Sequence, residues 1–267
     1  MCPFARRWVN GSGSLRARGT LCCHVLLIET DGGLVLVDTG FGTEDVADPK
    51  ARLGRMFVGA AQPKLLLSET ALHQVRGLGF NPNDVRHIVL THGDPDHGGG
   101  LPDFPEARVH IFKPEYEALS EPVGAEKHRY TAIRRHKDVK WALHDVDGES
   151  WMGFDAVRPL PGVLPEVLMI PLRGHSRGHV GVAVARPKGW MLHAGDAYFS
   201  EGQMQEPPHI PVGLGLFQKA VDYDRPARIK NQERLRQLAL NHGDEVQVFC
   251  AHDEQELLRA QDRAGSA

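Results

Sequence analysis

The sequence predicts an α/β (α+β) protein folded as a four-layer αββα sandwich. Short apolar runs typical of strands fall into two groups along the chain. Segments with helical periodicity lie between these runs and after them. Strands in two groups with helices outside them suggest two packed sheets whose outer faces the helices cover.

The first half of the chain opens with a predicted β-hairpin. Segments 21–29 and 34–38 are its strands, and Asp31-Gly32-Gly33 supplies the turn between them. Segment 68–77 is a predicted helix whose apolar face includes Leu72 and Val75. The other predicted elements of this half are strands at 85–91 and 108–112, a short helix at 114–119 opened by Pro114, and a weakly patterned helix at 126–137.

The second half contains predicted strands at 167–170, 180–185, 190–194 and 246–250. Segment 229–241 is a predicted helix with Leu235, Leu238 and Leu240 as apolar residues, and Gly243 ends it. The chain has 267 residues and 41% hydrophobic content, so it can bury a sizeable core. Since no linker-like stretch divides it, we expect one domain that spans residues 1–267.

The segment directly after strand 85–91 is the most informative for function. Its sequence HGDPDH places His92, Asp94, Asp96 and His97 within six residues. Neutral imidazole and carboxylate are ligands that zinc, iron and manganese accept. Gly-Asp-Pro-Asp also suits a solvated turn. Two histidines flanking two carboxylates after a buried strand favour a metal site instead.

Further candidate ligands follow strands of the second half. His175, Asp196 and His252 each lie a few residues after the carboxyl end of a predicted strand. Open α/β sheets gather their functional sites at such strand ends. We therefore expect these side chains to converge with segment 92–97 on one metal site.

Taken in their order along the chain, these histidine- and aspartate-bearing motifs resemble those of the metallo-β-lactamase superfamily of hydrolases. The match runs from about Leu21 to Asp253. The resemblance implies a four-layer αββα metallo-β-lactamase sandwich and a metal-dependent hydrolase. The matching motifs are Val37-Asp38-Thr39-Gly40, segment 92–97, Gly174-His175-Ser176-Arg177-Gly178-His179, Gly195-Asp196 and the final His252.

The resemblance also implies how the metal site is built. Asp38 would brace the loop of His92 through hydrogen bonds without binding metal. A site with a single metal ion stays open as an alternative. In the dinuclear site, His92, Asp94 and His175 would hold one divalent ion, Asp96, His97 and His252 would hold the other, and Asp196 would bridge them.

Position 94 departs from the superfamily pattern, in which most members carry histidine. With Asp94, Asp96 and Asp196 ionised, three negative charges would face two divalent cations. Such a ligand set favours harder metals over zinc. We therefore expect two divalent metal ions, which are zinc or, because of Asp94, iron or manganese.

The residues around Asp196 and His252 resemble the lactonase branch of the superfamily. The expected reaction is hydrolysis of a lactone or another carboxylic ester by a hydroxide that bridges the metals, with Asp96 passing a proton to the leaving group. Tyr198 would hydrogen-bond the carbonyl oxygen as charge develops on it. A buried Tyr198 whose hydroxyl is bonded elsewhere is an equal alternative.

Other activities use the same kind of site. A glyoxalase II-like thioesterase would act on a thioester and would usually need a basic patch for its anionic thiol carrier. A phosphodiesterase or nuclease shares the site chemistry. A redox enzyme is the non-hydrolytic alternative, because a carboxylate at position 94 resembles di-iron relatives, although those usually carry a flavin domain. The apolar segments 49–67 and 199–223 are candidates for lining the substrate pocket.

Composition limits the partners and the location. The net charge of −3 offers no basic field for a nucleic-acid backbone. No apolar run approaches the roughly 20 residues that a bilayer-spanning helix needs, and no signal-peptide core is visible. The four cysteines lack disulfide or CxxC spacing, which fits a reducing cytoplasm. We expect a cytoplasmic enzyme with a small-molecule ester or lactone substrate and no nucleic-acid or membrane partner; whether it forms a homodimer stays open.

Some residues close to the motifs are expected to be structural. His179 would make a hydrogen bond within its own turn, and His193 would be a satisfied core side chain. Cys22 and Cys23 would pack as small apolar side chains of a strand.

Overall fold

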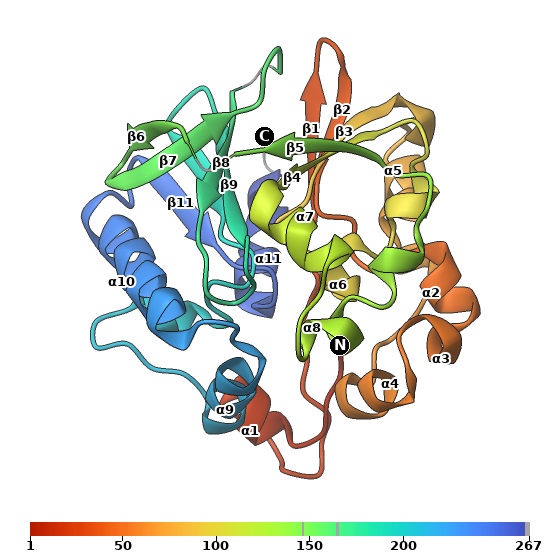
Figure 1. The fold of residues 1–267 in the computed structure, drawn as a ribbon. Coiled ribbons are helices and arrows are strands. Elements are labelled where there is room, and N and C mark those ends of the chain that lie inside the picture. Colours follow the sequence, from red (N-terminus) through yellow and green to blue (C-terminus); the bar gives the residue numbers. More distant parts are fainter. Residues whose placement is uncertain (146, 164–165, 265–267) are drawn as a thin grey trace.

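Two β-sheets pack face to face with helices on their outer sides (Figure 1). The structure is a computed structural model, and it describes residues 1–145, 147–163 and 166–264. The four-layer αββα arrangement expected from the sequence is confirmed. Within the described ranges, no helix is both long and apolar enough to cross a lipid bilayer.

The first sheet has the strand order β1-β2-β3-β4-β5. Its first two strands form the predicted hairpin, with Leu26 opposite Val37, and the other strands join in parallel. The hairpin begins later than predicted, at Leu26, so Cys22 and Cys23 lie before the strand and not in it. The last strand of this sheet, at Lys140–His144, was not predicted. The strands are β1 (Leu26–Thr30), β2 (Gly33–Val37), β3 (Val85–Val89), β4 (Arg108–Phe112) and β5 (Lys140–His144).

The second sheet has the strand order β11-β10-β9-β8-β7-β6. Neighbouring strands are antiparallel except for the parallel pair of β10 and β11. The four strands predicted in this half are confirmed within one residue at each end. The two strands that precede them in the chain, at Glu149–Trp151 and Phe154–Pro159, were not predicted. The strands are β6 (Glu149–Trp151), β7 (Phe154–Pro159), β8 (Val167–Pro171), β9 (Val180–Ala185), β10 (Trp190–His193) and β11 (Val246–Phe249).

The helices begin where the sequence offers caps. The Thr70 side chain accepts a hydrogen bond from the His73 amide, so the predicted helix 68–77 starts at Ala71. The Asp224 side chain accepts from the Ala227 amide, so the predicted helix 229–241 starts earlier, at Arg225. The helices are α1 (Arg6–Asn10), α2 (Thr43–Ala47), α3 (Pro49–Arg52), α4 (Arg55–Ala61), α5 (Ala71–Gly77), α6 (Pro95–Gly98), α7 (Lys113–Ser120), α8 (Glu126–Arg129), α9 (Val212–Val221), α10 (Arg225–Asn241) and α11 (Glu254–Ala264).

The predicted helix 126–137 is wrong in its length. The chain forms α8 and then a separate 3-10 turn at Ile133–Arg135. This break places the last residue of α8, Arg129, against the loops of the candidate site. Other 3-10 turns lie at Leu67–Glu69, Pro82–Asp84, Leu101–Asp103 and Glu201–Met204.

Buried apolar residues fill each interface between the layers. Leu36, Ile88 and Ile111 pack against helices α5 and α7 on the outer side of the first sheet. Val89 and Met169 belong to a cluster between the two sheets. On the outer side of the second sheet, residues of β8 to β11 pack against α10. Burial on both faces explains why the central strands are almost continuously apolar.

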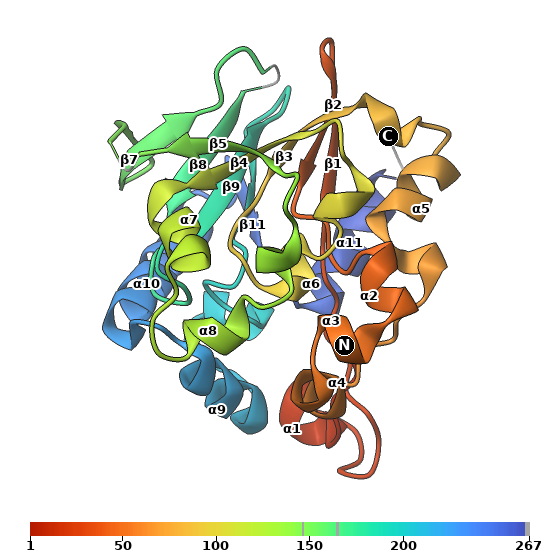
Figure 2. The ribbon, with the colours of Figure 1, turned by 45° about the vertical axis from the view of Figure 1, so that its right-hand side comes forward.

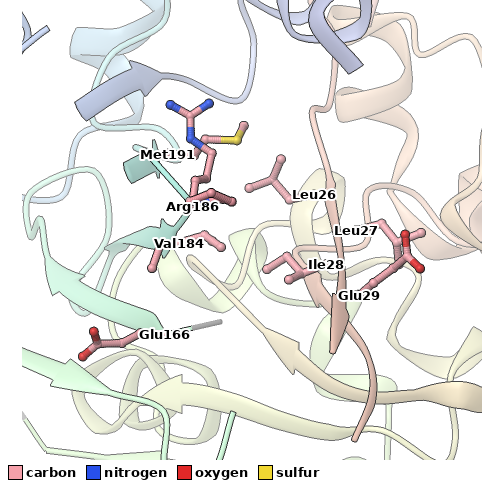
Figure 3. A pocket seen from close by; sticks show the side chains of 10 residues that line it. Leu26, Leu27, Ile28, Glu29, Glu166, Val184, Arg186 and Met191 are labelled. Atoms are coloured by element: carbon pink, nitrogen blue, oxygen red, sulfur yellow. The ribbon is translucent and has the colours of Figure 1, made fainter. Parts of the chain in front are cut away.

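The carboxyl ends of several strands lie at the same end of the sandwich. The loops after β3, β8, β10 and β11 meet near the end where α6 and α8 lie, as the two views show (Figure 1, Figure 2). A separate groove of about 630 Å³ runs between β1 and the ends of β9 and β10 (Figure 3). None of the predicted site residues lines this groove.

Candidate metal centre

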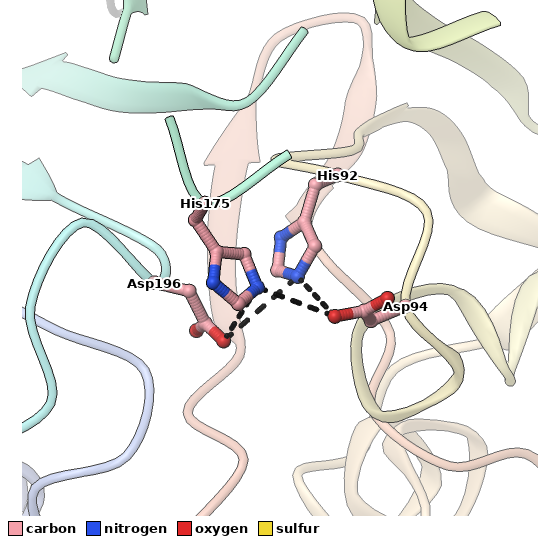
Figure 4. Close-up of side chains that lie close together, drawn as sticks. All are labelled: His92, Asp94, His175 and Asp196. Atoms are coloured by element: carbon pink, nitrogen blue, oxygen red, sulfur yellow. Dashed lines mark hydrogen bonds and ion pairs between the residues drawn. The ribbon is translucent and has the colours of Figure 1, made fainter. Parts of the chain in front are cut away.

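Four predicted site residues converge in a first ligand set, which consists of His92, Asp94, His175 and Asp196 (Figure 4). One ligand atom from each lies within 4.8 Å of the others. Asp94 Oδ2 lies 3.2 Å from Nε2 of both His92 and His175. Asp196 Oδ2 lies 3.3 Å from His175 Nε2. These distances bring together imidazole and carboxylate ligands as the sequence predicts.

The second ligand set consists of Asp96, His97, Asp196 and His252. Asp196 Oδ1 lies 3.2 Å from His97 Nε2 and 3.1 Å from His252 Nε2. Asp96 Oδ2 is 3.6 Å from His252 Nε2. Because Asp196 contacts both sets, its carboxylate lies between them. Cys23, which was expected to be a packing residue, forms a further ligand group with Asp96 and His252.

Hydrogen bonds fix which nitrogen of each imidazole faces the second set. His97 Nδ1 lies 2.7 Å from Asp38 Oδ2, and His252 Nδ1 lies 2.7 Å from the carbonyl oxygen of Cys22. Both partners only accept, so the proton of each neutral imidazole sits on Nδ1 and the Nε2 lone pair faces Asp196. This arrangement is typical of histidines that bind metal.

Unpartnered atoms in the second set show that it fits a divalent cation. His97 Nε2 and Asp196 Oδ1 are buried and make no hydrogen bond to the described residues. A buried lone pair that faces a carboxylate is unfavourable unless a cation lies between them. The electrostatics agree: burial lowers the pKa of His97, but Asp196 and Asp38 outweigh burial and raise that pKa well above its usual value. The negative charge of these two carboxylates attracts a proton or a metal ion to His97 Nε2.

Asp38 braces the loop of His92 through hydrogen bonds, as expected. Its carboxylate accepts hydrogen bonds from the backbone amide of Thr91 at 2.8 Å, from the Thr91 hydroxyl at 2.7 Å and from His97 Nδ1. Asp38 is buried and has a left-handed backbone with a φ of 59°. A left-handed backbone is strained for a residue other than glycine, and such strain clusters at functional sites.

His179 holds the loop of Asp196 in place. Its Nδ1 donates to the carbonyl oxygen of Leu172 at 3.0 Å, and its Nε2 accepts from the backbone amide of Asp196 at 2.9 Å. Gly195 has a φ of 54°, and a Cβ there would lie 2.5 Å from His179 Nε2. His179 is therefore structural, as expected, but its bonds reach beyond its own turn. His193 is also a satisfied core residue, since its Nε2 donates to the carbonyl oxygen of His24 at 2.8 Å.

Glu115 of α7 joins the two histidine-bearing loops and was not predicted from the sequence. Its side chain is fully buried. Oε1 accepts from the Gly93 amide at 2.9 Å, and Oε2 accepts from the Ser176 hydroxyl at 2.7 Å and the Gly178 amide at 2.8 Å. This carboxylate fixes the loop of His92 relative to the loop of His175.

Arg129 is the second site residue that sequence reasoning missed. Its Nε lies 2.5 Å from Asp94 Oδ1, and its Nη2 lies 2.7 Å from Asp94 Oδ2. Burial by itself raises the pKa of Asp94, but Arg129 and His92 lower it well below its usual value. The sequence did offer one signal for Arg129. Asp94 stands where most of the superfamily has histidine, and an additional buried carboxylate needs a cationic partner.

The structure corrects the expected catalytic role of Tyr198. Its side chain is completely buried among apolar residues of the second sheet. The hydroxyl donates a hydrogen bond to Glu256 Oε1 at 2.9 Å. Because this bond commits the hydroxyl to Glu256, Tyr198 is a core residue, which is the alternative that the sequence left open.

A cavity of about 610 Å³ adjoins the second ligand set at His252. Segment 199–223 contributes Phe199, Ile210 and Leu214 to its wall, as expected for one of the two candidate pocket segments. Segment 49–67 contributes none of the lining residues. Instead, α1 and the residues after it form the opposite wall, which was not predicted.

Phe199 connects the cavity to both ligand sets. Its ring centroid lies 5.8 Å from that of His175 and 5.3 Å from that of His252. It is also stacked on Phe217 of α9 at 5.9 Å. His175 and His252 therefore border an aromatic surface.

The chain matches the model of the metallo-beta-lactamase superfamily over residues 18–246. A protein named probable metallo-hydrolase from Mycobacterium tuberculosis is 41% identical over 254 residues, which cover 94% of this chain and 81% of the relative. An N-acyl homoserine lactonase of Bacillus thuringiensis is 24% identical over 228 residues, which cover 85% of this chain and 79% of the relative. The resemblance stated from the sequence motifs is confirmed.

Solved structures share the fold at lower identity. An N-acyl homoserine lactone hydrolase with the product N-hexanoyl-L-homoserine at its catalytic metal centre has a TM-score of 0.67 and 20% identity, covering 97% of this chain and 92% of that chain. The dizinc quorum-quenching lactonase AidC has a TM-score of 0.58 and 17% identity, covering 94% of this chain and 79% of that chain. From the family match and the ligand sets together, the chain belongs to the metallo-beta-lactamase superfamily of hydrolases.

Proposed function

We propose that this hydrolase opens a lactone or cleaves another uncharged carboxylic ester. The charge of the cavity beside His252 carries the choice of substrate. Its wall contains three carboxylates and one guanidinium, alongside apolar side chains. A wall with this excess of negative charge repels anionic substrates and accepts neutral ones. The charged residues of the wall are Arg6, Glu201, Asp253 and Glu254.

The same observation disfavours the two hydrolytic alternatives. A phosphodiesterase must bind a negatively charged phosphate, and a glyoxalase II-like thioesterase must bind an anionic thiol carrier. Either substrate would bring negative charge towards the carboxylates of the cavity wall, whereas a neutral lactone or ester would not. Arg6 is the one guanidinium among the described residues that line the cavity. Glu201 pairs with Arg259, which does not line it, and the carboxylates of Asp253 and Glu254 still outnumber Arg6.

The relatives support the same substrate class. The Bacillus thuringiensis relative is named an N-acyl homoserine lactonase, and the structure with the bound product is that of an N-acyl homoserine lactone hydrolase. Such a substrate combines an uncharged ester ring with an acyl chain. The apolar part of the cavity wall, which includes Leu21, Phe199 and Leu214, suits an acyl chain.

Asp96, His97, Asp196 and His252 are the residues that would hold a divalent cation. A bound divalent cation supplies Lewis acidity, which lowers the pKa of water and stabilises negative charge on a carbonyl oxygen. The argument for iron or manganese over zinc loses its basis, because Arg129 offsets the charge of Asp94. Zinc, iron and manganese are therefore equally compatible with the ligand sets.

Asp96 is the residue that we assign to proton transfer. It lies on α6 at the edge of the second ligand set, and its Oδ2 contacts His252 Nε2 at 3.6 Å. In this position Asp96 can accept a proton from water and pass it to the departing oxygen of the ester. Phe199 and the cavity wall around it orient the acyl part and exclude water.

The test compares catalytic efficiency on matched substrates. An acyl-homoserine lactone and a p-nitrophenyl carboxylate ester are compared with bis(p-nitrophenyl) phosphate and a glutathione thioester. We expect kcat/KM to be highest for the lactone or ester, to fall after chelator treatment and to recover with added divalent metal. A higher kcat/KM for the phosphodiester or the thioester would contradict the proposed substrate. Activity that chelation leaves unchanged would contradict metal dependence.

A further inference from the structure

A cationic side chain, the guanidinium of Arg129, already lies against the residues of the first ligand set. Its Nε and Nη2 donate to the two carboxylate oxygens of Asp94, at 2.5 Å and 2.7 Å. This is the bidentate geometry that makes arginine–carboxylate pairs strong and specific. Nη2 also lies 2.5 Å from His175 Nε2. The guanidinium therefore binds two of the residues that the superfamily resemblance assigns to a metal ion.

Backbone groups hold the guanidinium in this position independently of Asp94. Its Nη1 donates to the carbonyl oxygen of His175 at 3.0 Å and to that of Val221 at 2.9 Å. The side chain of Arg129 is 18% exposed, so it is largely enclosed by the site. A guanidinium with acceptors on all of its nitrogens has a defined place, unlike an exposed arginine that moves freely.

The helix that carries Arg129 is itself fixed to the loop of His175. Glu126 at the start of α8 is buried and accepts from Arg177 Nε at 3.2 Å and from Arg177 Nη2 at 2.5 Å. Arg177 lies in the loop that carries His175. Two ion pairs thus connect α8 to the loops that carry Asp94 and His175. One is formed by Arg129 and the other by Arg177.

The contacts of Arg129 leave the first ligand set incomplete for a metal ion. Both oxygens of Asp94 are bound to the guanidinium, and the Nε2 lone pair of His175 faces Nη2. His92 and Asp196 remain, and Asp196 also belongs to the second set. Structural and catalytic metal sites normally have at least three protein ligands. A divalent cation would also be repelled by the adjacent guanidinium.

We propose that Arg129 takes the place of a metal ion in the first ligand set, so that the protein binds one divalent cation, in the second ligand set. The inference rests on the metal dependence in the proposed function. It predicts that Asp94 and Arg129 form a matched pair: the carboxylate replaces the usual histidine because its partner is a guanidinium. The sequence expectation of two divalent ions remains a prediction, and the position of Arg129 is the observation that argues against it.

The test is the metal content of the purified protein, determined by elemental analysis after equilibration with excess Zn²⁺ and removal of free metal. We expect one ion per chain for the wild type. Arg129→Met removes the charge and frees Asp94 and His175, so we expect it to bind a second ion. Arg134→Met is the matched control, because it removes an exposed guanidinium from the 3-10 turn that follows α8. It should still bind one ion.

A second measurement needs no variant. Titration of the metal-depleted wild type with Co²⁺, followed by visible absorption, should saturate at one equivalent. Saturation at two equivalents would overturn the role of Arg129 and leave metal dependence intact. One ion in both the wild type and Arg129→Met would also overturn that role. A wild type that binds no metal in either measurement would contradict the proposed function itself, and the inference with it.

Discussion

Glu115 accepts a hydrogen bond from the backbone amide of Gly93 at 2.9 Å, although helix α7 and the loop after β3 are separate elements. Its other carboxylate oxygen accepts from Ser176 and Gly178 on the loop of His175. One buried carboxylate therefore links the two loops that supply the first ligand set. Residues in this supporting role commonly change metal affinity or activity by about 10- to 100-fold when they are replaced.

Glu115→Gln tests whether this link positions the ligands. Glutamine keeps one carbonyl oxygen as an acceptor, but its NH2 group cannot accept a hydrogen bond, so loop donors such as the Ser176 hydroxyl and the Gly178 amide would face another donor. We expect kcat/KM to fall by about 10- to 100-fold. The free energy of unfolding should fall by about 1–3 kcal/mol, because buried groups lose their partners. Steady-state kinetics and chemical denaturation measure the two effects.

Glu117→Gln on the exposed side of the same helix is the control. It should change neither quantity appreciably. If Glu115→Gln lowers stability but leaves kcat/KM at the wild-type value, Glu115 serves the fold alone and does not position the metal loops.

Local patterns in the sequence predicted which candidate ligands lie together, but not the residues that support them. His92, Asp196 and His252 each follow an apolar strand, so their convergence at one end of the sandwich was predictable. Glu115 and Arg129 lie on short helices, and their roles depend on how those helices pack against loops distant in sequence. No spacing along the chain encodes that packing.

The missed strand β5 has a related explanation. The five residues of Lys140–His144 are half-buried or exposed. The strand therefore lacks the apolar run by which the buried strands β3 and β4 were identified.

Tyr198 shows the opposite error, because its closeness to Asp196 in the sequence suggested a role in the site. The hydroxyl of Tyr198 is bonded to Glu256 instead.

Asp96→Asn tests the assignment of proton transfer. Asparagine keeps an oxygen beside His252, so we expect the variant to retain much of its metal. Because general acid–base catalysis contributes roughly 10²- to 10⁴-fold, kcat/KM for a lactone should fall by about that factor. The fall should be smaller for a p-nitrophenyl ester, whose leaving group departs without a proton. Elemental analysis and kinetics on both substrates provide the measurements.

The matched control for Asp96→Asn is Glu254→Gln, which alters a carboxylate in the cavity wall outside both ligand sets. It should leave the ratio of kcat/KM between the two substrates unchanged. An equal loss on both substrates for Asp96→Asn would argue against a role in protonating the leaving group.

Tyr198→Phe separates a core residue from a catalytic one. The Tyr198 hydroxyl donates to Glu256 Oε1, so its removal leaves a buried carboxylate oxygen without that donor. We expect the free energy of unfolding to fall by about 1–3 kcal/mol. We expect kcat/KM to stay within about twofold of the wild type, which is less than about 0.5 kcal/mol of transition-state stabilisation. Tyr223→Phe, at a residue that is 52% exposed, should change neither. A large loss of kcat/KM in Tyr198→Phe at unchanged stability would restore its catalytic role.

Three histidines form a chain of hydrogen bonds across neighbouring strands of the first sheet. His110 Nε2 lies 2.9 Å from His87 Nδ1, and His110 Nδ1 lies 2.9 Å from His144 Nε2. Burial, with His144, His87 and Arg108 nearby, lowers the pKa of His110 from 6.5 to about 3. The folded protein therefore holds His110 neutral at pH values where the unfolded chain is protonated.

This difference predicts a loss of stability in acid. The neutral His110 contributes its full stabilisation above the unfolded pKa of 6.5, and that contribution is lost as pH falls towards the folded pKa of about 3. Between about pH 7.5 and about pH 5, linkage to this one group lowers the free energy of unfolding by about 2 kcal/mol. In His110→Gln the fall over this range should be smaller by that amount, as measured by urea denaturation at each pH. His128→Gln, at an exposed histidine, should retain the wild-type pH dependence. Equal pH dependence in wild type and His110→Gln would mean that His110 is protonated in the folded protein, and that the imidazole chain tolerates the charge.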